Sequence, residues 1–180
     1  MYAKYLICPI LCLLFFFCVI GWGIARFTNY INFEIHCGGH LKRAADANTV
    51  DLALQELKTA TTYTEQNNLT KGSTHLLFPT PDKDVGFWYK NLKASEKELE
   101  LISPQTTQLE KTNLLMKLRE TLLDQGEKGT SVTAPQGISI FPDNWPYAIW
   151  GWVSIILCGF FMGLGVYCHL YMVVQSDWFK

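Results

Sequence analysis

Residues 5–25, YLICPILCLLFFFCVIGWGIA, decide the fold, because they contain no charged side chain and lie between Lys4 and Arg26. An α-helix rises about 1.5 Å per residue, so a stretch of this length spans the roughly 30 Å hydrocarbon core of a bilayer. Aromatic residues lie near both ends, as in membrane-interface belts. The stretch therefore predicts a transmembrane helix at residues 5–26, after a short tail at residues 1–4.

A cleaved signal peptide is the alternative for the same stretch. Lys4 supplies a basic start, residues 6–20 supply an apolar centre, and Gly23-Ile24-Ala25 resembles a cleavage site of small residues. The apolar run is long for a signal peptide, which favours a retained signal anchor.

A second apolar stretch follows at residues 144–176, which contain no Asp, Glu, Lys or Arg. Tryptophans gather at its start, and Trp178 follows its end. We expect a second transmembrane helix at residues 145–175 and a short tail at residues 176–180. His169 near its inner end is interpreted as a hydrogen-bonded or snorkelling histidine rather than a proton relay.

Gly159 and Gly163 form a GxxxG pattern in this second stretch. Small residues let helix backbones approach closely in lipid, so the pattern predicts a contact with the first span or self-association with another chain. Ordinary glycine use in membrane helices is the alternative.

Charge and cysteine content exclude several classes of protein. The net charge is −1, from 15 basic and 16 acidic residues, so no basic excess argues for nucleic acid as a partner. Of the six cysteines, only Cys37 lies outside the two apolar stretches. The polar block therefore cannot form a disulfide within itself.

The polar block between the two stretches has helical periodicity. After a junction at residues 27–39, where Gly38-Gly39 should break or bend a helix, we expect a helical bundle at residues 40–125. Apolar spacings of three and four predict helices at about 40–66, 84–102 and 103–124. The cap signals are Asp82 or Asp84 for the second helix and Ser103-Pro104 for the third.

Each of these predicted helices has an apolar stripe. The stripes are Ala47, Val50, Leu54, Leu57 and Thr61; then Val85, Trp88, Leu92, Ser95, Leu99 and Ile102; then Leu115, Leu118 and Leu122, joined by Leu109 and Met116.

An extended return strap is expected at residues 126–144, because three antiparallel helices leave the chain far from the membrane. Ile138-Ser139-Ile140-Phe141 should pack between helices or on the membrane surface. The fold class is therefore an all-α membrane protein, with two transmembrane helices flanking an antiparallel three-helix bundle of coiled-coil-like packing. The short basic N-terminus favours cytoplasmic termini and an extracytoplasmic central domain, periplasmic if the host is bacterial.

Two sites stand out in the polar block. His36, Cys37 and His40 combine ligand types that bind metal or haem, although Gly38-Gly39 makes their geometry awkward; polar residues at a hinge, or an intermolecular Cys37 disulfide, are the alternatives. Phe87-Trp88-Tyr89 cannot all face one core, so Phe87 or Tyr89 should meet the strap or be exposed to a partner.

The layout of span, helical domain and span resembles the ligand-sensing half of a bacterial chemoreceptor, a resemblance of architecture without a shared motif. That resemblance implies a sensor, but only residues 177–180 follow the second stretch, which leaves no signalling module. We expect a non-enzymatic accessory, scaffold or assembly subunit that needs no cofactor and contacts the lipid bilayer and other membrane proteins. A small-ligand sensor or regulator, with a pocket in the bundle and lateral signalling through the second span, is the alternative, and a metal or haem protein is the least favoured.

Overall fold

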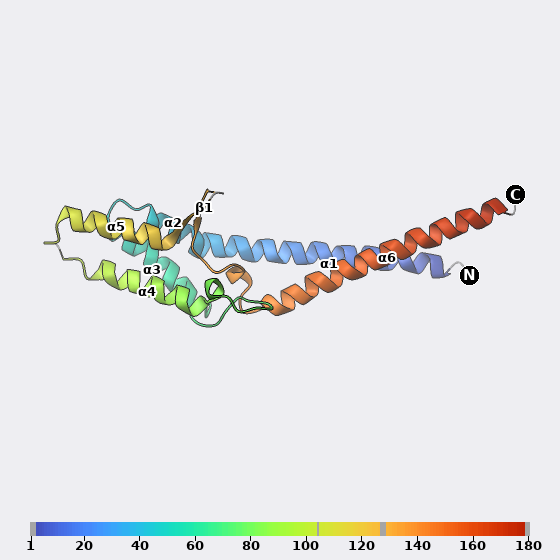
Figure 1. The fold of residues 1–180 in the computed structure, drawn as a ribbon, viewed down its shortest axis with the longest axis horizontal. Coiled ribbons are helices and arrows are strands. Elements are labelled where there is room, and N and C mark those ends of the chain that lie inside the picture. The colour runs from blue at the N-terminus through green and yellow to red at the C-terminus, as the bar shows by residue number, and fades with distance from the viewer. Residues whose placement is uncertain (1–2, 104, 127–128, 179–180) are drawn as a thin grey trace. The chain divides into compact units, whose positions relative to one another are not determined.

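The computed structural model describes residues 3–103, 105–126 and 129–178 of the chain. It is mostly helical, with one two-stranded antiparallel sheet (Figure 1). Two helices are long and apolar enough to cross a membrane.

The chain divides into two compact units, which are described separately. The apolar unit consists of residues 1–27 and 145–180, and the central unit consists of residues 28–144. Helix α1 (Ala3–Phe33) contributes residues to both units, and α6 (Asn144–Trp178) lies almost entirely in the apolar unit.

In the apolar unit, α1 and α6 contact each other along several turns. The indole Nε1 of Trp22 donates a 2.7 Å hydrogen bond to the carbonyl oxygen of Tyr147. The rings of Phe15 and Phe161 stack with their centroids 5.7 Å apart. Most other large side chains of this unit are exposed, as expected for helices with an apolar circumference.

The central unit contains four α-helices that pack around one core. These are α2 (Gly39–Ala45), α3 (Val50–Gln66), α4 (Val85–Glu100) and α5 (Gln108–Leu122). Helix α3 packs against both α2 and α4, and α5 contacts all three (Figure 1). The core is formed by small and branched apolar side chains, with Leu41, Leu57, Leu92 and Leu122 almost completely buried.

The sequence predicts a break or a bend at Gly38-Gly39, and the structure shows no break there. The helical path continues from α1 through a π-helical turn, η1 (Glu34–Gly38), and directly into α2. Glycine permits this turn: a Cβ at Gly39 would lie 2.9 Å from the carbonyl oxygen of Glu34.

The predicted helix at 40–66 is two helices. Helix α2 ends at Ala45 and α3 starts at Val50, where the Thr49 side chain accepts a 3.3 Å hydrogen bond from the Leu52 amide. Threonine is a favourable N-cap, and this signal inside the apolar stripe was missed. The predicted C-terminal end is confirmed, since Asn67 follows α3 and Asn68 has a φ of 58°.

The second predicted helix agrees closely with α4. Its Asp84 N-cap is confirmed by a 3.0 Å hydrogen bond from the Phe87 amide to Asp84 Oδ1. The buried positions follow the predicted stripe at Val85, Trp88, Leu92 and Leu99.

The predicted start of the third helix, at residue 103, is too early. Helix α5 starts at Gln108, after a capping box in which Thr107 and Glu110 bond each other's backbone amides, so Ser103-Pro104 is not its start; Pro104 lies outside the described residues. Leu118 and Leu122 are buried as predicted, whereas Leu109 and Met116 are 70% and 58% exposed.

The predicted strap at 126–144 is only partly extended. Strands β1 (Leu123–Gly126) and β2 (Gly129–Val132) pair antiparallel, so the fold is not purely α-helical. A 3-10 turn, η3 (Ile138–Ile140), then brings Ile138 into the core, as expected for this apolar segment. The remaining short element is a 3-10 turn, η2 (Pro81–Lys83), before α4.

Candidate functional site

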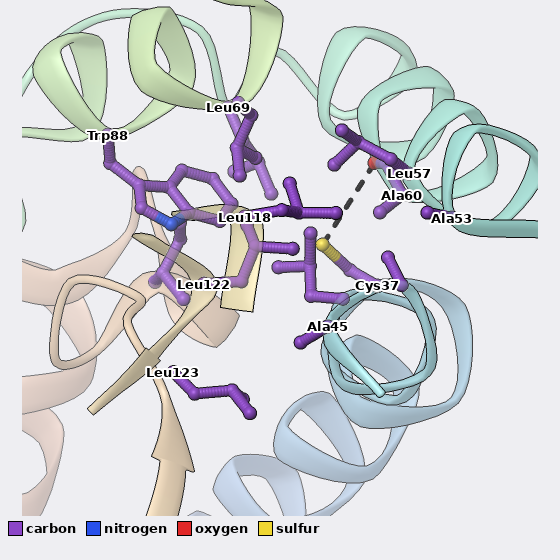
Figure 2. Packing of buried hydrophobic residues seen from close by; sticks show 14 of the residues in the cluster. Cys37, Ala45, Ala53, Leu57, Ala60, Leu69, Trp88, Leu118, Leu122 and Leu123 are labelled. Carbon is purple, nitrogen blue, oxygen red and sulfur yellow. Dashed lines mark hydrogen bonds between the residues drawn. The ribbon is translucent and has the colours of Figure 1, made fainter. Parts of the chain in front are cut away.

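The predicted metal ligands do not converge. Cys37 is fully buried, and its Sγ points toward the carbonyl oxygen of Ala60 on α3, 4.0 Å away (Figure 2). Burial, reinforced by the nearby Glu34 carboxylate, raises the pKa of the Cys37 thiol to about 12. A buried thiol with a raised pKa stays protonated and packs in the core, whereas the thiolate is the form that reacts or binds metal.

The two histidines lie on another side of the same helical turn. The His36 ring stacks on Tyr63 at 5.8 Å, and His40 Nδ1 lies 2.6 Å from Glu56 Oε2. Both line a shallow depression of about 390 Å³ beside Tyr63. Over residues 3–103, 105–126 and 129–178, no group of three His, Cys, Asp or Glu side chains is arranged to hold a metal ion.

The predicted aromatic site has the arrangement that consecutive helical positions require. Trp88 is 7% exposed and packs in the core, Phe87 is 61% exposed, and Tyr89 is half-buried. The Tyr89 hydroxyl donates a 2.7 Å hydrogen bond to Glu65, which lowers the pKa of that carboxyl. Phe87 is therefore the aromatic side chain left available for a partner.

Phe87 lies at the edge of a cleft of about 610 Å³ within the central unit, which we call the Phe87 cleft. One wall is the N-terminal half of α4, including Trp88 and Leu92. The opposite wall is β2 and the strap that follows it, including Val132 and Pro135.

The strap wall of the Phe87 cleft is fixed to the end of α5 by Thr133. Its amide donates a 2.9 Å hydrogen bond to the carbonyl oxygen of Leu122, and its hydroxyl donates one of 2.7 Å to that of Thr121. The α4 wall is fixed by the Asp84 cap and by an antiparallel bridge between Asp84 and Ser73. Both walls are thus held by hydrogen bonds that leave the cleft open between them.

The charged side chains that line the Phe87 cleft are all acidic. They are Asp82, Asp84 and Asp124, and no Lys or Arg among the described residues lines it. A hydrogen bond from the Thr80 side chain is the main cause that lowers the pKa of Asp82, so this carboxylate is ionised at neutral pH. An apolar cleft with an acidic edge is chemically suited to an apolar segment flanked by basic residues.

Part of this cleft was missed by sequence reasoning. Asp82 and Asp84 were considered only as helix caps, and Asp124 only as a helix end. Gly126 and Gly129 frame two residues between runs that can pair, which is a hairpin signal that was not used. Recognising the hairpin would have placed β2 beside β1.

The predicted GxxxG contact has no partner within the described chain. Cβ atoms added at Gly159 and Gly163 would meet nothing within 4 Å. The glycine of α6 that approaches α1 is Gly151 instead, where an added Cβ would lie 2.6 Å from the Trp22 indole.

No family model matches the chain, and no curated protein or solved structure matches it either.

Proposed function

We propose that this chain is a membrane-anchored, non-enzymatic accessory or scaffold protein whose central unit binds another protein in the Phe87 cleft. The two apolar helices anchor it in the bilayer, with both termini cytoplasmic and the central unit extracytoplasmic. The observation that supports the proposal best is the exposed Phe87 beside an open apolar cleft with an acidic edge. Large exposed aromatic residues beside apolar hollows are typical anchors of protein interfaces.

The partner chemistry follows from the two properties of the cleft. The partly exposed Val132 and Ala134 offer apolar surface to an inserted side chain, and Asp82 and Asp124 offer negative charge to flanking Lys or Arg. Strand β2 forms part of the wall, so an extended segment of the partner fits better than a helix. We infer an extended apolar segment with basic residues on each side.

The test uses the full chain in nanodiscs of zwitterionic lipid and two fluorescent probe peptides. One peptide has a Leu-Phe-Leu centre flanked by lysines, and the other has the same centre flanked by glutamates. We expect fluorescence anisotropy to show binding of the lysine peptide alone. Phe87→Ala should weaken that binding about tenfold, as expected for an anchor worth about 1.4 kcal/mol.

Matched variants separate the contributions of shape and charge. Asp82→Asn with Asp84→Asn removes two charges while asparagine retains the helix cap, and it should weaken binding and reduce its salt dependence. Leu101→Ala, at a leucine after α4 that is 74% exposed, should change nothing. Equal binding of both peptides, or equal effects of Phe87→Ala and Leu101→Ala, would contradict the proposal.

A small-ligand sensor remains the second candidate, because a separate cavity of about 520 Å³ lies among the start of α3, the end of α4 and the start of α5. Leu54, Leu99 and Leu115 line it together with the charged Asp51 and Lys111. A thermal-shift screen of the full chain tests this candidate. A compound that stabilises the native chain but not a cavity-filling Leu115→Trp variant would support it.

A further inference from the structure

An exposed apolar loop lies between α3 and α4. Leu77 and Phe78 are 74% and 77% exposed, and Leu76 beside them is 37% exposed. The loop is closed at its base: Ser73 forms a bridge with Asp84, and the Thr74 amide donates a 3.0 Å hydrogen bond to the carbonyl oxygen of Lys83. The leucines and the phenylalanine therefore lie at the tip of a fixed hairpin-like loop.

This loop lies at the end of the central unit where the chain enters and leaves that unit. The last turn of α3 lies beside the residues at the start of the central unit, because Tyr63 packs edge-on against Phe33 and stacks on His36. After α3, a Cβ at Gly72 would lie 2.9 Å from the ring of Phe141, three residues before the end of the unit at Asn144. The base of the loop is thus close to both connections to the apolar helices.

The opposite end of the central unit provides an internal comparison. Helix α4 (Val85–Glu100) starts at the loop and runs away from it for 16 residues, or about 24 Å at 1.5 Å per residue. Leu101, 74% exposed, is the C-cap residue at that far end. The two ends therefore expose apolar residues at very different distances from the chain connections.

We propose that Leu76, Leu77 and Phe78 insert into the surface of the bilayer that holds α1 and α6. The inference rests on the proposed membrane anchoring. An interfacial segment binds lipid by burying apolar side chains among headgroups and acyl chains, and a leucine-leucine-phenylalanine tip followed by proline has that chemistry. The loop is a third attachment point, which restricts tilting of the central unit on the membrane.

Wild-type protein in liposomes containing a phospholipid with a diazirine in its acyl chain tests the proposal. After illumination, trypsin should release peptides 5–26, 72–83 and 98–111, which end at Arg26, Lys83 and Lys111. We expect lipid adducts on 5–26 and 72–83, and about tenfold fewer on 98–111, because the diazirine reaches only side chains within the acyl region.

Two serine variants and the adducts on 5–26 separate insertion of the loop from membrane anchoring of the chain. The double variant Leu77→Ser/Phe78→Ser should lose the adducts on 72–83 and keep those on 5–26, whereas Leu101→Ser should leave the wild-type pattern intact. Adducts on 5–26 with none on 72–83 would overturn the loop proposal alone. An absence of adducts on 5–26 would overturn the membrane anchoring and the loop proposal together.

Discussion

Cys37 shows how strongly a single residue depends on its place in the core. Its sequence neighbours His36 and His40 suggested a ligand cluster, and an intermolecular disulfide of Cys37 was an alternative. The structure instead buries it completely against α3 (Figure 2). The helical periodicity that predicts the burial of Cys37 was not used, because Gly38-Gly39 was expected to break or bend the helix before α2.

The thiol of Cys37 should not react with a maleimide while the protein is folded. Burial shields the sulfur from the reagent, and the raised pKa of the thiol keeps the amount of thiolate low. Labelling of Cys37 in the native protein therefore cannot report on which side of the membrane the central unit lies. An Asn113→Cys variant places a thiol on the exposed face of α5 and should be labelled rapidly. Mass spectrometry before and after denaturation checks this, and equal labelling rates at both positions would contradict the buried placement.

Glu56 is a second residue whose environment the sequence did not indicate. It is 9% exposed on α3, and its two carboxylate oxygens bond His40 and Arg43 on α2. Glu56→Gln should lower the free energy of unfolding by about 1–3 kcal/mol, because a charge-assisted hydrogen bond is lost at a poorly solvated position. Chemical denaturation in detergent, followed by circular dichroism, measures the change.

The control for Glu56 is a solvent-exposed ion pair in the same unit. Glu100 pairs with Lys58, and both side chains are more than 40% exposed. Glu100→Gln should leave the free energy of unfolding nearly unchanged, as is usual for surface pairs. Similar costs for the two substitutions would argue against a structural role for the Glu56 pairing.

Among the elements, the buried helix faces were more predictable than the helix ends. The spacing of Val85, Trp88 and Leu92 identified the buried face of α4 because one side of a helix must be apolar to pack. Ends depend on single capping contacts, such as Thr49 for α3 and Thr107 for α5, for which the sequence offered competing candidates. The Phe87 cleft shows the same difference. The exposure of Phe87 followed from helical spacing, whereas placing Asp124 in the cleft required knowledge of the β1–β2 hairpin.

The π-helical turn η1 makes an unusual prediction for Gly39. Replacing glycine by alanine inside a helix normally stabilises it by roughly 0.5–1 kcal/mol. At Gly39 the new Cβ would lie 2.9 Å from the Glu34 carbonyl oxygen, which is backbone and cannot move aside easily. Gly39→Ala should therefore lower the melting temperature of the central unit.

The exposed Ala94 of α4 provides the matched control for this prediction. Ala94→Gly reports the ordinary cost of glycine in a helix of the same unit, about 1 kcal/mol, and should also lower the melting temperature. We expect both Gly39→Ala and Ala94→Gly to destabilise the protein, although the two substitutions are opposite in kind. A higher melting temperature for Gly39→Ala would show that η1 places no steric demand on that position.

For the whole molecule, the two apolar stretches predicted that distant parts of the chain come together, but not which residues meet. Composition identified both segments because lipid requires only an apolar circumference. The meeting residues depend on shape: Trp22 fits against Gly151, whereas Gly159 and Gly163 meet nothing in the described chain. A GxxxG pattern signals a surface that permits close packing, and which glycine is used depends on the shape of the neighbouring helix.

Cysteines at the two ends of the chain report this pairing directly. Cys12 and Cys158 each place Sγ 3.9 Å from the other's carbonyl oxygen. Oxidation of the reconstituted protein by copper phenanthroline should therefore form a disulfide within one chain. Gly151→Leu should reduce its yield severalfold, because the leucine would occupy the space of the Trp22 ring and push the helices apart. Gly159→Leu, at a position with open space, should leave the yield unchanged.

The readout for this pairing is whether the two halves of the chain stay linked after proteolysis in the central unit. Linked fragments that separate on reduction, in the wild type and in Gly159→Leu but not in Gly151→Leu, would establish that α1 and α6 pair through the Trp22–Gly151 contact. Oxidation that yields only dimers of intact chains would show that the cysteines meet between molecules instead. Loss of the link in Gly159→Leu alone would place the glycine pattern, rather than Trp22, at the helix contact.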